Sequence, residues 1–210
     1  MTRIASLVPA LLLAAAALPV AAQPTGALAE SIGTWRLTCA TDRMTDRTAC
    51  TLLHQRPAER SEPGSPALAL EIVDRGGHLL PAVTARDLTL EGASRGLLAL
   101  TGTVQLRFPP DPLIEMPCGL EGRSLVCAPR GEADATRAEQ ELAQADRALL
   151  RVVATGGGST AEPVELPLSR TREAMARFRQ LVPPGSTPSP APPVLDPADL
   201  LQRFRQLFGL

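Results

Sequence analysis

The sequence predicts a mainly β domain of antiparallel strands, with one or two short helices packed at its edge. Short runs alternate apolar and polar residues, most clearly at 68–72 and 104–108, and such alternation is typical of strands that bury one face. Clusters of Gly, Pro, Asp and Ser separate these runs, as turns between strands require. Four cysteines in two close pairs behind an apolar N-terminus indicate an exported domain stabilised by disulfides.

Residues 1–22 have the composition of a cleaved secretory signal peptide. Arg3 forms a short basic start, residues 4–20 are apolar, and small side chains precede the expected cleavage after Ala22. No cysteine follows that point, so a lipid anchor is not expected. An uncleaved membrane anchor is the alternative, but Pro9, Pro19 and the small residues at the end of the run favour cleavage. We expect the mature chain, residues 23–210, to be periplasmic or secreted.

The charge of the mature chain argues against a nucleic-acid-binding protein. Of the 21 basic residues only Arg3 lies in the leader, so 20 basic residues remain against 22 acidic ones. A nucleic-acid-binding protein needs a basic surplus on some face. Lys, Asn and Tyr are absent, which we interpret as the coding bias of a GC-rich, bacterial genome.

Eight segments have the pattern expected of strands. They are residues 34–39, 50–55, 67–73, 88–90, 97–108, 124–127, 149–155 and 163–168. The glycine run at 156–158 lies between the last two and predicts a hairpin connection. A phosphate-binding loop is the alternative, but no helix start and no Lys follow the run.

Two helices are predicted in the domain. Thr136 and Glu139 fit a capping box at the start of the first helix. Its apolar stripe is Ala138, Leu142 and Ala145. The second helix covers 171–182 and ends before two prolines. Its apolar side is Met175, Phe178 and Val182, positions that favour a place in the core over a role in ligand binding.

The four cysteines are predicted to be structural. Three pairings are possible, and proximity in the sequence favours Cys39 with Cys50 and Cys118 with Cys127. A thiol oxidoreductase would need a C-x-x-C motif, which is absent. A zinc site would need tighter ligand spacing than the cysteines and the two histidines offer. We expect no metal and no cofactor.

No motif predicts catalysis. The chain lacks the G-x-S-x-G elbow of serine hydrolases, and His54 and His78 stand in no triad-like pattern. A glycosidase-type carboxylate pair could be drawn from Glu71, Asp74 and Glu115, but nothing favours these acids over others. The default interpretation is that such acids are exposed on a solvated face. We therefore expect a protein that is not an enzyme.

Residues 33–39 and 45–50, with a Trp four positions before a Cys and a second Cys shortly after, resemble the opening of the invasion-associated locus B family. Residues 97–108, 116–119 and 125–127 are similar to the middle and second Cys pair of that family. The resemblance implies an immunoglobulin-like antiparallel β-sandwich that is periplasmic or surface-associated, without known enzymatic activity, in a family linked to host-cell invasion. Trp35 would be its core anchor; a ligand-stacking platform is the alternative.

The C-terminal tail is separate from the domain of residues 23–181. Residues 182–197 contain seven prolines and predict an extended linker, and residues 198–210 predict an amphipathic helix. The helix could fold back on its own domain, dock into the groove of a partner protein, or lie on an anionic membrane surface. The apolar face of this helix, formed by Leu200, Leu201, Phe204, Leu207 and Phe208, is the candidate surface for binding a partner.

Two functions follow from these features. The first is a non-enzymatic exported module that binds a protein or envelope partner, with the tail helix as a tether. The second is a secreted inhibitor of an envelope hydrolase, because small disulfide-stabilised β domains present rigid loops to active sites. Residues 109–112, three prolines and Asp111, would form that inhibitory loop.

Overall fold

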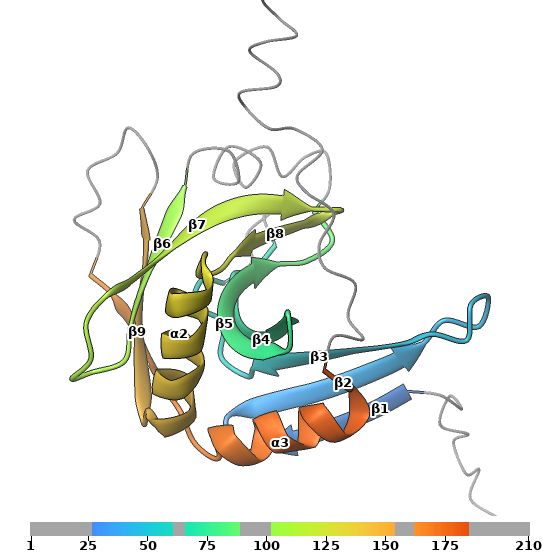
Figure 1. Cartoon of the computed structure of the whole chain (residues 1–210). Helices are drawn as coiled ribbons and strands as arrows, with labels where there is room; N and C mark the ends of the chain where they lie inside the picture. The colour runs from blue at the N-terminus through green and yellow to red at the C-terminus, as the bar shows by residue number, and fades with distance from the viewer. Residues whose placement is uncertain (1–26, 61–65, 89–101, 154–161, 185–210) are drawn as a thin grey trace, which may run out of the picture.

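The computed structural model describes residues 27–60, 66–88, 102–153 and 162–184 (Figure 1). Within these ranges, ten antiparallel strands form one curled sheet with two helices packed against it. The strands are β1 Ala27–Ile32, β2 Trp35–Thr41, β3 Thr48–His54, β4 Ala69–Arg75, β5 His78–Ala85, β6 Thr103–Arg107, β7 Ile114–Glu121, β8 Ser124–Cys127, β9 Arg147–Val153 and β10 Val164–Pro167. The helices are α2 Glu132–Gln144 and α3 Thr171–Leu181. Neither helix has the length and apolar character needed to cross a bilayer.

The sheet curls so that distant strands share one core. Its order is β1-β2-β3-β4-β5-β8-β7-β6-β9-β10, and in Figure 1 β1–β3 lie at the bottom, β7 and β8 at the top, and β6 and β9 at the left. Leu37 and Leu52 of the first half therefore belong to the same buried cluster as Leu106 and Leu150 of the second half. The helix α2 packs on β5, and α3 packs across β1, β2 and β3.

The β1–β2 turn is joined to the segment between β10 and α3. Ser169 N donates to Thr34 Oγ1 at 3.1 Å, and the buried Trp35 donates from Nε1 to Thr171 Oγ1 at 3.1 Å. Gly33 has φ +58°, and a Cβ there would overlap the carbonyl oxygen of Ser169. Only glycine fits this close approach without strain. The last strand and helix are thus fixed to the start of the sheet.

Both helices are also fixed by the β4–β5 hairpin. Arg179 of α3 donates to Asp74 Oδ2 at 2.8 Å and to the carbonyl oxygen of Gly77. Glu139 of α2 accepts a hydrogen bond from the backbone N–H of Leu79 at 2.8 Å. The hairpin therefore holds two helices through charge-assisted hydrogen bonds, which are stronger than neutral ones.

The predicted β class and most predicted strands are confirmed. The strands expected at 34–39, 50–55, 67–73, 124–127, 149–155 and 163–168 correspond to β2, β3, β4, β8, β9 and β10 within two residues at their described ends. The run at 97–108 contains β6, and its residues 97–101 lie outside the described ranges. The expected strand at 88–90 is wrong at Leu88, which is described and lies in no strand; residues 89 and 90 lie outside the description.

Three strands were not predicted: β1, β5 and β7. Seven of the eight residues of β5 are buried, so it lacks the alternation of a half-buried strand, and Pro81 lies in its middle. β7 contains Pro117 and Gly119, residues that are also uncommon inside strands. Proline and glycine lower strand propensity, and here tertiary packing overrides that preference.

The start predicted for the first helix is wrong. Helix α2 begins at Glu132, one turn before the expected capping box, so Thr136 lies inside the helix. Its N-cap is Gly131, which makes no side-chain capping bond, and acidic residues in the first turn favour the helix dipole instead. Two residues of the predicted apolar stripe, Ala138 and Leu142, are buried, and the third, Ala145, is the C-cap residue of the helix. The second predicted helix is confirmed as α3, with its expected apolar side buried: Met175, Phe178 and Val182.

Candidate binding groove

The outer face of β6 and β9 carries two arginines next to apolar side chains. Alternation along β6 turns Gln105 and Arg107 away from the core, and alternation along β9 does the same for Leu149 and Arg151. The antiparallel register places Gln105 opposite Arg151 and Arg107 opposite Leu149. Four side chains from two strands that are distant in sequence thus form one patch.

The loop between β6 and β7 completes a hollow over this patch. Phe108 is fully buried and anchors the loop, and its carbonyl oxygen accepts a hydrogen bond from Asp111 N at 2.8 Å. Leu113 at the end of the loop is 43% exposed, which is high for a large apolar side chain. The hollow has a volume of about 360 Å³, within the range of small-ligand sites. It is lined by Gln105, Arg107, Pro112, Leu113, Leu149, Arg151 and Pro163, which we call the groove.

Neutral oxygen atoms hold both guanidinium groups of the groove. Arg107 Nε donates to the carbonyl oxygen of Asp111 at 2.9 Å. Arg151 donates to Gln105 Oε1 from Nε at 3.0 Å and from Nη2 at 2.6 Å. The arginine–carboxylate ion pairs within 4.0 Å that form among the described residues involve other arginines. The two groups are therefore oriented, and no carboxylate of the described residues contacts them to neutralise their charge.

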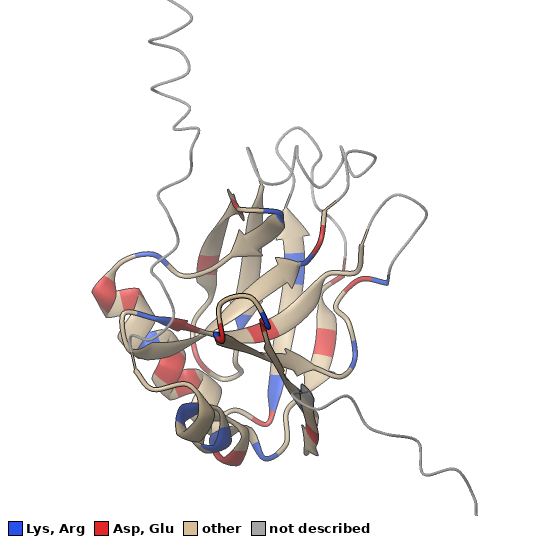
Figure 2. Ribbon diagram, turned by 90° about the vertical axis from the view of Figure 1, so that its right-hand side faces the viewer, with Lys and Arg blue, Asp and Glu red and all other residues tan. Residues whose placement is uncertain are grey.

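Acidic residues stand near the groove without pairing with its arginines. In the register, Glu115 of β7 lies opposite Gln105, and Glu165 of β10 lies opposite Leu149. Figure 2 shows the same interspersion of acidic and basic residues along other strands and along the helices. The positive charge of the groove is thus local and bounded by negative charge.

A half-buried acid on α2 interacts with the groove loop. Burial raises the pKa of Glu141, the nearby Arg137 opposes that shift, and the negative charge of Asp111 adds to it. One carboxylate oxygen of Glu141 is buried without a hydrogen-bond partner among the described residues. The carboxylates of Asp111 on the loop and Glu141 on α2 therefore repel each other weakly.

The two predicted disulfides are present in the structure. Cys39 pairs with Cys50 across β2 and β3, with Cα atoms 4.0 Å apart, and Cys118 pairs with Cys127 across β7 and β8, with Cα atoms 3.9 Å apart. In both cases the two residues are directly opposite in the register. All four cysteines are disulfide-bonded, so none is a free thiol available for redox or metal chemistry. Two disulfides suggest an oxidising, extracytoplasmic location.

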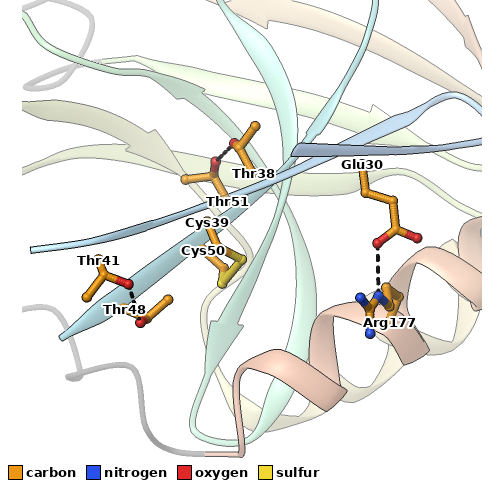
Figure 3. Close-up of a disulfide and its surroundings, with 8 residues drawn as sticks. All are labelled: Glu30, Thr38, Cys39, Thr41, Thr48, Cys50, Thr51 and Arg177. Atoms are coloured by element: carbon orange, nitrogen blue, oxygen red, sulfur yellow. Dashed lines mark hydrogen bonds and ion pairs between the residues drawn. A yellow bond between two sulfur atoms is a disulfide. The ribbon is translucent and has the colours of Figure 1, made fainter. Parts of the chain in front are cut away.

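Figure 3 shows the first disulfide between two hydrogen-bonded threonine pairs of the β2–β3 hairpin. The Oγ1 atoms of Thr38 and Thr51 are 2.7 Å apart, and those of the second pair, nearer the tip, are 2.9 Å apart. Next to this hairpin, Arg177 of α3 donates to Glu30 of β1 at 2.9 Å. These cross-strand pairs stabilise the hairpin.

The acids considered for catalysis serve as structural partners. Against the expectation of exposed acids, Glu71 and Asp74 are both buried. Thr84 donates to Glu71 at 2.7 Å and Arg86 forms an ion pair with it, while Asp74 holds α3 as described above. Being three residues apart on β4, the two acids point to opposite faces of the sheet. Glu115 is exposed on β7.

The histidines and the tryptophan are structural as well. His54 is buried, its Nε2 lies 2.9 Å from the carbonyl oxygen of Pro167, and its ring meets Trp35 edge to face. Trp35 is fully buried, so the alternative of a ligand-stacking platform is wrong. His78 Nδ1 lies 2.8 Å from Glu139 Oε2. In the described part of the chain, no three His, Cys, Asp or Glu side chains are arranged to hold a metal ion.

Several predicted features lie outside the described residues. These are the leader at 1–22, the glycines at 156–158, most of the linker, and the proposed partner-binding face Leu200, Leu201, Phe204, Leu207 and Phe208. The loop at 109–112, which was considered as an inhibitory loop, is described, and its residue Pro112 lines the groove. Arg107 and Arg151 were not predicted, because the alternation in 104–108 shows which residues face outwards but not which strand lies beside them.

Fold and groove define a class: a disulfide-braced, mainly antiparallel β protein with an arginine-bearing surface hollow. Comparison of the chain with protein-family models, curated proteins and solved structures finds no match.

Proposed function

We propose that the protein is a non-enzymatic, exported binding module of the bacterial envelope and that the groove is its recognition surface. The observation that carries the proposal is the pair of arginines, Arg107 and Arg151, held by neutral oxygen atoms inside a partly apolar hollow. Binding sites combine apolar walls with a few oriented polar groups, and the groove has both.

Export and family membership belong to the same proposal. Cleavage after Ala22 and a periplasmic or secreted location are supported by the composition of the leader and by the two disulfides. Membership of the invasion-associated locus B family is supported by the order of Trp35 and the four cysteines. An immunoglobulin-like sandwich is supported by the curl of the sheet, which packs strands of its two halves around one core.

The tail helix is proposed as a second contact, which tethers the module to a protein or membrane partner. Capture from envelope extract by cross-linking tests the division of roles between groove and tail. Three proteins are compared: residues 23–210, the same chain ending at Val182, and residues 23–210 with Arg107→Gln and Arg151→Gln. A partner lost only in the groove variant supports recognition by the groove, and one lost only on truncation assigns recognition to the tail. Equal capture by all three would remove the groove from the proposal.

The second candidate function is a secreted inhibitor of an envelope hydrolase. It is favoured by the loop at 109–112, which is anchored by buried Phe108 and presents Pro112 and Leu113 to solvent. The mature protein, with an Asp111→Ala variant beside it, is tested against lysozyme-like and protease activities. Inhibition that weakens in the variant supports this function, and no inhibition at large molar excess rejects it.

A further inference from the structure

We infer that the groove binds an amphiphilic anion, with one carboxylate or phosphate head at Arg107 and Arg151 and an apolar body along Leu149 and Leu113. This inference rests on the proposed function, because it names the ligand class of the same groove. The two halves of the ligand correspond to two independent features of the site, its oriented charge and its exposed apolar lining.

The head group is indicated by the unused donors of the arginines. A guanidinium has five N–H groups, and within the described part of the chain each of these arginines makes two hydrogen bonds, all to neutral oxygens. Among the described residues, its remaining donors are therefore open to a ligand. Neutral acceptors orient a guanidinium without cancelling its charge. Carboxylates and phosphates accept such donors in pairs, with charge-assisted bonds. The preferred occupant of these donors is therefore an oxyanion.

The apolar body is indicated by side chains that gain from being covered. Leu113 is 43% exposed, and Leu149, Pro112 and Pro163 line the hollow with it. Covering apolar surface is favourable in proportion to the area removed from water. An inorganic anion would leave this surface wet, whereas an alkyl chain next to the head group would cover it.

The acids beside the groove limit the ligand to a compact head. Glu115 lies on β7 beside β6, and Glu165 lies on β10 beside β9, so acids stand on both sides of the two strands that carry the arginines. A polyanion that extends beyond the groove would therefore meet negative charge. The volume of about 360 Å³ suits a small molecule or the end of a lipid. A single anionic head on an apolar chain satisfies both the charge and the volume.

Titration calorimetry on the mature chain, residues 23–210, tests the inference with defined probes. Octanoate and octyl phosphate represent the two heads, inorganic phosphate lacks the chain, and octyl glucoside lacks the charge. We expect binding of at least one anionic amphiphile and much weaker binding of phosphate alone and of octyl glucoside. Binding of octyl glucoside as tight as that of the anions, or no binding of either anionic amphiphile, would overturn the inference.

Variants then locate the site. Arg151→Gln is expected to weaken binding about tenfold or more, since a charged hydrogen bond is lost. Leu113→Ser should also weaken it, and Arg147→Gln, a charge change on the same strand outside the groove, should not. An equal loss in Arg147→Gln would refute the site, provided that circular dichroism shows each variant folded. If no amphiphile binds while partner capture still depends on Arg107 and Arg151, the ligand class is wrong and the binding module stands.

Discussion

Removing the disulfide of the β2–β3 hairpin should cost a calculable amount of stability. Cys39 and Cys50 are 11 positions apart, and the chain-entropy relation gives about 2.8 kcal/mol for a loop of that length. Cys118 and Cys127, 9 positions apart, give about 2.6 kcal/mol by the same relation. Both cysteines of the second pair are buried, whereas Cys50 of the first pair is only partly buried, so replacing the second pair should cost at least as much as replacing the first.

The assay is equilibrium unfolding in urea of residues 23–210, followed by circular dichroism. Cys39→Ala with Cys50→Ala is compared with the wild type, oxidised and reduced. Thr41→Val with Thr48→Val is the matched control, because it removes an exposed cross-strand pair of the same hairpin and should cost under about 1 kcal/mol. Free thiols in the oxidised protein, or a loss of stability in the cysteine variant no larger than in the threonine control, would show that this disulfide does not stabilise the fold.

Three further predictions test the contacts that hold the helices. Glu141→Gln should raise the melting temperature at pH 7. The pKa of Glu141 is raised above its ordinary value of 4.5, so the charged carboxylate lowers the stability of the fold as the pH rises above 4.5. A gain in melting temperature that persists unchanged at pH 4 would contradict this. Thr171→Val should cost about 1–3 kcal/mol in urea unfolding, since it leaves the buried N–H of Trp35 without its acceptor, and a neutral result would show that this bond contributes nothing. Arg179→Met should cost about 2–3 kcal/mol, because it removes a charged hydrogen-bond donor to the buried Asp74, whereas a loss near zero would mean that this ion pair does not stabilise the position of α3.

Secondary structure was predictable where one face of an element is buried. The alternation at 104–108 corresponds to β6, and the apolar spacing at 171–182 corresponds to α3, because in both the periodicity reports burial directly. The prediction from periodicity missed β5, whose residues are buried on both faces. The predicted helix start at Thr136 was also wrong, because the helix begins one turn before this local capping pattern.

The groove could not be found from the sequence because it depends on pairing between non-consecutive strands. Hairpins such as β2–β3 follow from proximity, so the pairing of Cys39 with Cys50 was predictable. The contact between Arg151 and Gln105 requires β9 to lie beside β6, after β7, β8 and α2 have intervened in the chain. Nothing local to either residue specifies that neighbour, since the curl of the whole sheet decides it.

Site-specific photo-crosslinking in cells that export the protein tests whether the groove is the recognition surface. A photoreactive residue is placed at position 149 inside the groove or, as control, at position 36 on the exposed face of β2. We expect an adduct from position 149 that is lost when Arg107→Gln and Arg151→Gln are added, and none from position 36. Adducts of equal yield from both positions, or an adduct at 149 that survives loss of both arginines, would contradict it.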